Sequence, residues 1–135
     1  MSDTQLAPGI FHQLVHNVTE DVLAVNVGSG SVRVLATPMI VAFMEEAASA
    51  CVAPYLGEGK TTVGTSIAIS HSAPTFFGGA VSVKATLTAV SAGGRSFTFA
   101  VEARDNAGIV AQGTHERFAV DKAKFEAKAK DRLAN

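Results

Sequence analysis

The chain has 135 residues, 47% of them hydrophobic, which is typical of a single domain with a substantial core. Its 11 basic and 12 acidic side chains leave a formal net charge of −1, which argues against nucleic acid or an anionic membrane as a partner. A single cysteine excludes an internal disulfide, and the polar N-terminus has no signal-peptide pattern, so we expect a cytoplasmic protein.

The N-terminal part of the chain predicts a tail, one strand and a segment without a clear period. Residues 1–9 end at a Pro-Gly pair and are typical of a flexible tail. Residues 10–18, IFHQLVHNV, alternate between apolar and polar side chains and predict a first strand. Residues 19–36 are crowded with apolar side chains but are interrupted by GSGS, so their secondary structure is ambiguous.

Residues 39–55, MIVAFMEEAASACVAPY, predict one long helix that is apolar on nearly every side. Thr37 suits the N-cap and Pro38 the first helical position. Proline and glycine near the other end place the helix stop between residues 53 and 57. Cys51 lies inside this apolar stretch and is expected to be a buried, unreactive thiol.

After this helix, the hydrophobic period changes to the period of two that is typical of strands. Four strands are predicted, at residues 61–71, 79–90, 96–102 and 109–120, with hairpin signals in AGGR and DNAG between the last three. The final sequence DKAKFEAKAKDRL predicts a short charged helix. The inward-facing side chains are expected to be Val63, Ile67, Ile69 and His71 in the first of these strands, then Val81, Val83, Ala85, Leu87, Phe97, Phe99 and Val101.

One strand, a long helix and four strands joined largely by tight turns indicate an α+β fold with an antiparallel sheet. A helix that is apolar on every side must be covered on every side, and a single five-stranded sheet can do so only by curling around it. We therefore predict one domain over residues 1–135 with a hot-dog fold, in which the sheet wraps one long central helix and a short helix ends the chain.

Three short patterns imitate cofactor sites but fail their requirements. The sequence GEGKTT resembles the end of a phosphate-binding loop, but Pro54 stands where the first glycine is needed. In GSGSVR, Arg33 occupies the last glycine position of the dinucleotide fingerprint. His12 and His16, four residues apart on a strand, lie about 13 Å from each other, which is too far for one metal ion. We expect neither a cofactor nor a metal.

The two glutamates of the helix occupy different positions around its axis. A rotation of about 100° per residue places Glu46 in a narrow arc of small side chains, where a charge can reach water or an interface rim. Glu45 falls in the broad arc of bulky apolar side chains, where a carboxylate needs a partner or a raised pKa. Glu45 is therefore a candidate for chemistry, and the structural alternative is an ion pair. The candidate partners are Arg33, Arg95 and Arg117.

Three further positions allow both a structural and a chemical interpretation. Thr37 before a proline is ordinary helix capping. His71 lies on the apolar face of its predicted strand, where a hydrogen-bonded core histidine is the simpler interpretation. Gly64 fits a bulge or a close approach of the backbone.

A family resemblance favours the chemical interpretation. The sequences LATPMIVAFMEEAA, TTVGTSIAISHSAPT and VEARDNAGIVAQGTHERFAVD resemble the fluoroacetyl-CoA thioesterase-like branch of the hot-dog thioesterases. The match runs in register from about Val34 to the end of the chain. The resemblance implies that Thr37, Glu45 and His71 are catalytic and that the backbone N–H of Gly64 lies near the thioester carbonyl.

The expected function is hydrolysis of a short-chain or small acyl-CoA to the free acid and CoA. The segment before Val34 departs from the family pattern, which weakens fluoroacetyl-CoA as the specific substrate. The alternative is a non-catalytic hot-dog module that binds an acyl-CoA. A hot-dog hydratase is disfavoured, because this sequence lacks the Asp and His that such an enzyme carries within one short helix-loop segment. Thr37 and Glu45 are about 12 Å apart along the helix, so either substrate or water lies between them or a second protomer completes the site. We expect a homodimer, with a tetramer of two dimers as the alternative.

Overall fold

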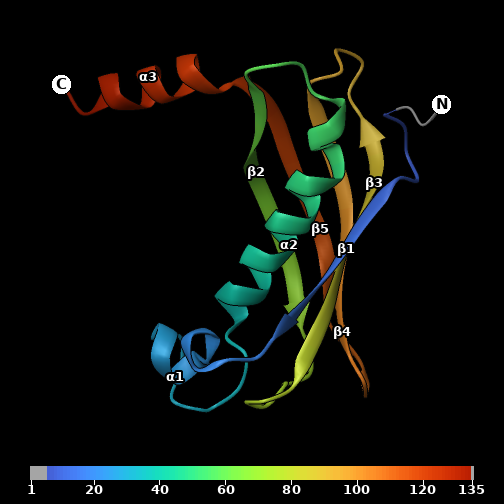
Figure 1. Cartoon of the computed structure of the whole chain (residues 1–135), viewed down its shortest axis with the longest axis vertical. Helices are drawn as coiled ribbons and strands as arrows, with labels where there is room; N and C mark the ends of the chain where they lie inside the picture. The colour runs from blue at the N-terminus through green and yellow to red at the C-terminus, as the bar shows by residue number, and fades with distance from the viewer. Residues whose placement is uncertain (1–5, 135) are drawn as a thin grey trace.

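The computed structural model describes residues 6–134. One long helix, α2, packs against a curved antiparallel sheet, and a second helix, α3, leaves the end of the sheet (Figure 1). The strands are β1 (Phe11–Asn17), β2 (Lys60–His71), β3 (Ala80–Val90), β4 (Ser96–Asp105) and β5 (Gly108–Asp121). The helices are α1 (Ala24–Val27), α2 (Thr37–Val52) and α3 (Lys122–Arg132), with 3-10 turns η1 (Glu20–Val22) and η2 (Ala53–Tyr55).

The sheet has five strands in the order β1-β3-β4-β5-β2, and every neighbouring pair is antiparallel. Residues far apart in sequence therefore lie side by side, because β2 and β5 pair along almost their whole lengths. The strand order leaves β1 and β2 as the two edges of the sheet. The predicted α+β hot-dog architecture, with its short C-terminal helix, is confirmed.

The core lies between α2 and the concave face of the sheet. The alternation predicted for β3 and β4 is confirmed, since all seven of their predicted inward side chains are at most 2% exposed. Cys51 on α2 is buried, and burial raises the pKa of its thiol, as expected for an unreactive cysteine. The fold is thus held mainly by the apolar faces of these strands packing on α2.

The N-terminal segments link β1 to α2. Residues 1–5 of the predicted tail lie outside the described part of the chain, but the N–H of Gly9 donates to the carbonyl of Leu87 at 2.8 Å. The ambiguous residues 19–36 form η1, the single turn of α1 and a connecting loop. Residues 28–33, which contain the GSGS sequence, form neither helix nor strand.

The start of α2 differs from the prediction by one residue. Ala36 is the N-cap, Thr37 is the first helical residue, and the Thr37 side chain makes no capping hydrogen bond. Proline is tolerated at either of the first two helical positions, because their N–H groups have no partner within the helix, so its presence does not fix the register. The helix ends at Val52, followed by η2, close to the predicted range.

A bulge in β2 overturns the predicted facing of Val63. The pairing of β2 with β5 shifts between Gly64 and Ser66, so the extra residue Thr65 reverses the alternation. Thr62 is buried, at 5% exposed, and faces the same side as Ile67, whereas Val63 faces the opposite side. Residues 61–71 predict a continuous period of two, because their sequence does not reveal where one extra residue is inserted into the ladder of hydrogen bonds.

The last helix, α3, is capped at its start and lies at the end of the sheet (Figure 1). The carboxylate of Asp121 accepts a hydrogen bond from the N–H of Lys124 at 3.0 Å, which satisfies the helix start. None of its described residues is buried.

Among residues 6–134, no helix combines the length and the apolar character needed to cross a membrane.

Candidate active site

The first group of site residues lies where α2 begins. Thr37 Oγ1 and His71 Nδ1, the latter at the end of β2, are 2.6 Å apart. The other ring nitrogen of His71, Nε2, is buried and has no hydrogen-bond partner among the described residues. A buried nitrogen without a partner is costly, so it marks a place where a further polar group belongs. The Thr37 hydroxyl therefore forms a hydrogen bond with His71 and does not cap the helix.

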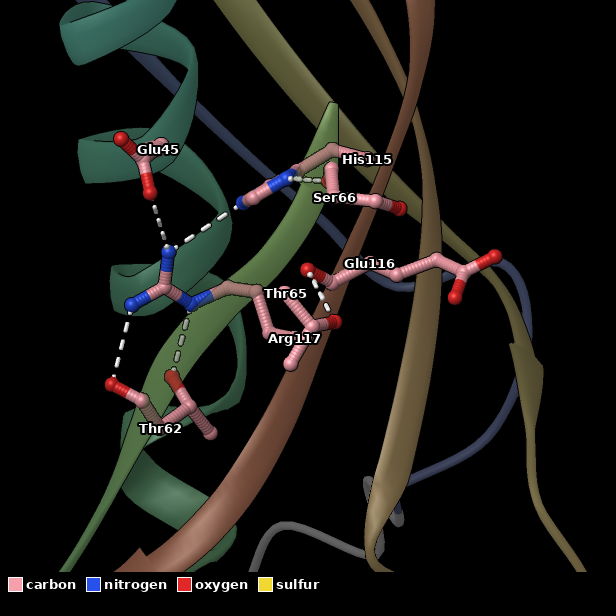
Figure 2. A network of polar contacts seen from close by, with 7 residues as sticks. All are labelled: Glu45, Thr62, Thr65, Ser66, His115, Glu116 and Arg117. Carbon is pink, nitrogen blue, oxygen red and sulfur yellow. Dashed lines mark hydrogen bonds and ion pairs between the residues drawn. The ribbon is translucent and has the colours of Figure 1, made fainter. Parts of the chain in front are cut away.

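The second group lies at the middle of α2 (Figure 2). Glu45 Oε2 is 3.3 Å from Arg117 Nη1, a residue of β5. The Arg117 side chain is only 8% exposed, whereas that of Glu45 is 43% exposed. The carboxylate therefore has one oxygen near a buried cation and a path to solvent. Of the three predicted partners Arg117 is the one found.

The guanidinium of Arg117 is held from several sides. Its Nε donates to Thr62 Oγ1 at 2.8 Å and its Nη2 to the Thr62 carbonyl at 2.9 Å, both from β2. Burial lowers the pKa of Arg117 and the nearby carboxylate of Glu45 opposes that shift. An arginine is nevertheless always charged in proteins, so a fixed positive charge underlies Glu45.

His115 completes the support beneath this charge. Its Nδ1 lies 2.8 Å from the carbonyl of Ser66, which can only accept, so Nδ1 carries a proton. Its Nε2 lies 3.2 Å from Arg117 Nη1, which can only donate, so Nε2 carries none. Burial, reinforced by the charge of Arg117, lowers the pKa of His115 against the effect of the Ser66 contact. The imidazole is thus a neutral, single tautomer.

Gly64 allows the carboxylate to reach the edge strand. A Cβ at this position would overlap Glu45 Oε2 and would lie 3.3 Å from His115 Cε1 and 3.4 Å from Arg117 Nη1. Glu45, Gly64 and His115 line a cavity of about 190 Å³ with residues 65–67. The glycine is therefore required by a close approach, which the sequence indicated without naming the neighbour.

Glu46 points to another side of the helix, as predicted. Its side chain is 55% exposed and its Oε1 lies 2.8 Å from His16 Nε2 on β1. The His16 ring stacks on Phe43, with centroids 3.7 Å apart. Glu46 is therefore an exposed charge with a surface partner, and His16 has a structural role.

The structure brings the predicted residues together in two pairs, not in one cluster. Thr37 meets His71, and Glu45 meets Gly64, while the helix places the two pairs about 12 Å apart along its axis. Sequence reasoning missed His115 and Thr62. The signal for His115 was its spacing of two from Arg117 on a strand, which puts both on one face.

Within residues 6–134, no cluster of His, Cys, Asp and Glu could hold a metal ion.

Comparisons with known proteins identify the family to which the chain is similar. A family model described as the fluoroacetyl-CoA-specific thioesterase matches residues 18–123. The fluoroacetyl-CoA thioesterase of Streptantibioticus cattleyicolor is 38% identical over 100 residues, which cover 74% of this chain and 70% of that protein.

Two solved structures give the same result for the fold. A structure of the fluoroacetyl-CoA thioesterase FlK superposes with a TM-score of 0.87 at 30% identity, covering 95% of this chain and 98% of the other. A thioesterase superfamily member from Thermus thermophilus gives a TM-score of 0.85 at 28% identity, with 96% of each chain covered. The chain therefore belongs to the family of fluoroacetyl-CoA-specific thioesterases.

Proposed function

We propose that this protein is an acyl-CoA thioesterase that hydrolyses a short-chain or small acyl thioester to the free acid and CoA. The observation that carries the proposal is the Glu45 carboxylate, which lies against Gly64 at a small open cavity above a buried, charged arginine. A crystal structure of a variant of the fluoroacetyl-CoA-specific thioesterase contains fluoroacetate and CoA, the two products of such a reaction.

The reaction needs a nucleophile, a donor for the oxyanion and a proton for the leaving thiolate. Glu45 is suited to take a proton from water, whose oxygen then attacks the thioester carbonyl, or to attack the carbonyl itself and form an anhydride that water cleaves. The N–H of Gly64 would stabilise the oxyanion. Cleavage of the carbon–sulfur bond returns the electron pair to sulfur, and the thiolate takes up one proton. Water is thereby divided between acid and thiol.

Thr37 and His71 would act on the opposite side of the thioester. Since His71 Nε2 is buried and without a described partner, a bound water or the substrate would supply its hydrogen bond. The contact of Nδ1 with Thr37 Oγ1 fixes the plane of the ring. His71 would then direct the attacking water or donate the proton that the thiolate needs.

A homodimer is part of the proposal because the two pairs are too far apart for one protomer. The edge strand β2 carries both Gly64 and His71, and no strand among residues 6–134 pairs with its outer side. Antiparallel pairing of two β2 strands, with the two-fold axis between Ile67 and Ala68, would bring Gly64 of one protomer toward the partner's His71. Pairing of dimers into a tetramer and a cytoplasmic location stay predictions from the sequence.

Release of thiol from a series of acyl-CoAs tests the proposal directly. We expect turnover to be highest for short acyl chains and to decline as the chain lengthens. The alternative, a module that binds acyl-CoA without hydrolysing it, would give no thiol release from any thioester while CoA esters still bound tightly. That outcome would overturn the proposed activity but keep the family assignment.

A further inference from the structure

A second cavity lies between α3 and the end of β5, outside the residues assigned above. Its volume is about 390 Å³, and its lining includes Arg95, Phe118, Asp121, Lys124, Phe125 and Lys128. The family model ends at residue 123, so most of α3 lies beyond it. Figure 1 shows α3 leaving β5 beside the start of β2 and running away from the sheet.

The lining carries positive charge that the protein itself does not balance. Arg95, Lys124 and Lys128 form no ion pair with another described residue, whereas Asp121 caps α3 and lies 3.9 Å from Lys60. Lys124 and Lys128 are four residues apart on one helix face, an arrangement that destabilises an isolated helix. These three cations are therefore suited to bind an anion with several charged oxygens, whereas they form no ion pair that would stabilise the described part of the protein.

Two aromatic rings line the same cavity. Phe125 on α3 is 43% exposed, and Phe118 on β5 lies beneath Arg95, whose guanidinium carbon is 5.9 Å from the ring centroid. The Phe125 ring is exposed and the Phe118 ring is partly buried. Accessible rings beside arginine and lysine form a surface on which a nucleic acid base can stack while its phosphates contact the cations. The lining therefore combines the two requirements of a nucleotide bearing several phosphates.

The position of the cavity agrees with the length of the substrate. Asp121 pairs with Lys60 in the sheet, and Lys60 is four residues from Gly64 along β2. That separation is about 13 Å along the strand, and the long flexible arm that joins the thioester of an acyl-CoA to its nucleotide spans such a gap. We propose, resting on the function proposed above, that Arg95, Lys124 and Lys128 bind the phosphates of the CoA nucleotide and that Phe118 and Phe125 hold its adenine.

Kinetics with two thioesters would separate this site from the catalytic one. S-acetylpantetheine carries the thioester but lacks the nucleotide, whereas acetyl-CoA carries both. For Arg95→Ala and Lys128→Ala we expect KM for acetyl-CoA to rise roughly tenfold at low salt, kcat to stay unchanged and both constants for S-acetylpantetheine to stay unchanged. The difference from the wild type should shrink at high salt because the site is exposed and screened. Lys130→Ala is the matched control, since it removes the same charge from α3 outside the cavity and should leave both substrates unaffected.

Calorimetric titration with adenosine 3′,5′-bisphosphate tests the same site without turnover. We expect binding to the wild type and to Lys130→Ala, and binding about tenfold weaker to Arg95→Ala and Lys128→Ala. Equal binding to all four proteins, or an equal rise in KM for both thioesters, would overturn the nucleotide site. A different result is a wild type that hydrolyses neither thioester while the titration still shows weaker binding to Arg95→Ala and Lys128→Ala than to the other two proteins. That result would contradict the proposed hydrolysis and support the nucleotide site.

Discussion

The carboxylates of Glu45 and Glu46 are adjacent in sequence but have different electrostatic surroundings. Glu45 lies 3.3 Å from a guanidinium that is 8% exposed, whereas Glu46 pairs with His16 at the surface. A charge pair with a buried partner is sensitive to the loss of either member, while an exposed pair contributes little. The two residues should therefore respond differently to the same substitution.

Glu45→Gln should lower kcat by on the order of 10²-fold or more, the usual scale for a lost general base, because the amide can neither accept the proton nor attack the thioester. Its amide oxygen can still accept from Arg117, so the free energy of unfolding should fall by only about 1 kcal/mol. Turnover by thiol release and thermal melting are measured on the same preparation. Normal turnover with an early melt would make Glu45 a structural anion.

Glu46→Gln provides the matched control at the neighbouring position. Its carboxylate is 55% exposed, so both kcat and the melting temperature should stay close to those of the wild type. A large loss of turnover in this variant would show that the assignment of the two glutamates is reversed.

The sequence could predict the candidate site residues and their elements, but not all of their contacts. The helical period separated Glu45 from Glu46, and Arg117 was among three possible partners. The other two are engaged elsewhere: Arg33 lies 2.6 Å from Glu20, and Arg95 lies over Phe118. Choosing among them requires the pairing of β2 with β5, which runs from Lys60–Asp121 to His71–Ala111 and so leaves no local periodic signal.

At the scale of elements, the regular strands were predictable and the irregular joints were not. The alternation in β3 and β4 follows from apolar side chains packing on α2, and the turn residues between strands fix the hairpins. The bulge at Gly64–Ser66 and the one-residue shift at the start of α2 depend on tertiary contacts. Both irregularities lie at the candidate site, where the backbone departs from its regular pattern to position Gly64 and Thr37.

The approach of β2 to α2 at Gly64 leads to a prediction about this bulge. Gly64→Ala would place a methyl group where Glu45 Oε2 now lies. The carboxylate is the flexible end of a side chain, so it can move aside and the protein should still fold, with a melting temperature close to that of the wild type. Displacing the carboxylate by about 1 Å should nevertheless lower kcat/KM by on the order of 10²-fold.

Thiol release and thermal melting of Gly64→Ala decide this point. Substitution of Gly93, in the β3–β4 turn, is a suitable control, because a Cβ there would meet no atom within 4 Å. Full activity of Gly64→Ala would show that the close approach of Glu45 to the strand has no part in catalysis.

At the scale of the whole molecule, the buried imidazole of His115 makes stability depend on pH. Burial lowers its pKa in the folded state below the ordinary value of 6.5. The unfolded chain therefore binds the proton first as pH falls, so the stabilisation is complete above about pH 6.5 and is lost as pH falls from there toward the folded-state pKa. The melting temperature should decline below pH 6.5 in the wild type.

Replacing His115 should remove part of that decline. His115→Gln keeps a polar side chain but no titrating group, so its melting temperature should vary less between pH 7 and pH 5, even if it is lower throughout. His12→Gln, at an exposed histidine on β1, is the control and should keep the slope of the wild type. Equal slopes in all three proteins would show that His115 does not titrate on unfolding.

The division of the site between protomers can be tested by mixing two inactive variants. If Thr37 and His71 of one protomer work with Glu45 and Gly64 of its partner, each site of a homodimer draws on both chains. Thr37→Ala and Glu45→Gln homodimers should each have little activity. In a heterodimer of the two, one site carries both substitutions and the other carries neither. Random exchange makes half of the dimers mixed, so activity should recover to about a quarter of the wild-type value.

The same mixture would behave differently if every protomer held a complete site, because each chain of the heterodimer would then carry one substitution and no intact site would form. Activity would stay at the level of the separate variants. The measurement is thiol release before and after partial unfolding and refolding of an equal mixture, with each variant refolded alone as the control. Recovery in the mixture alone requires that the two pairs of residues, held about 12 Å apart by α2 in each chain, meet across the interface.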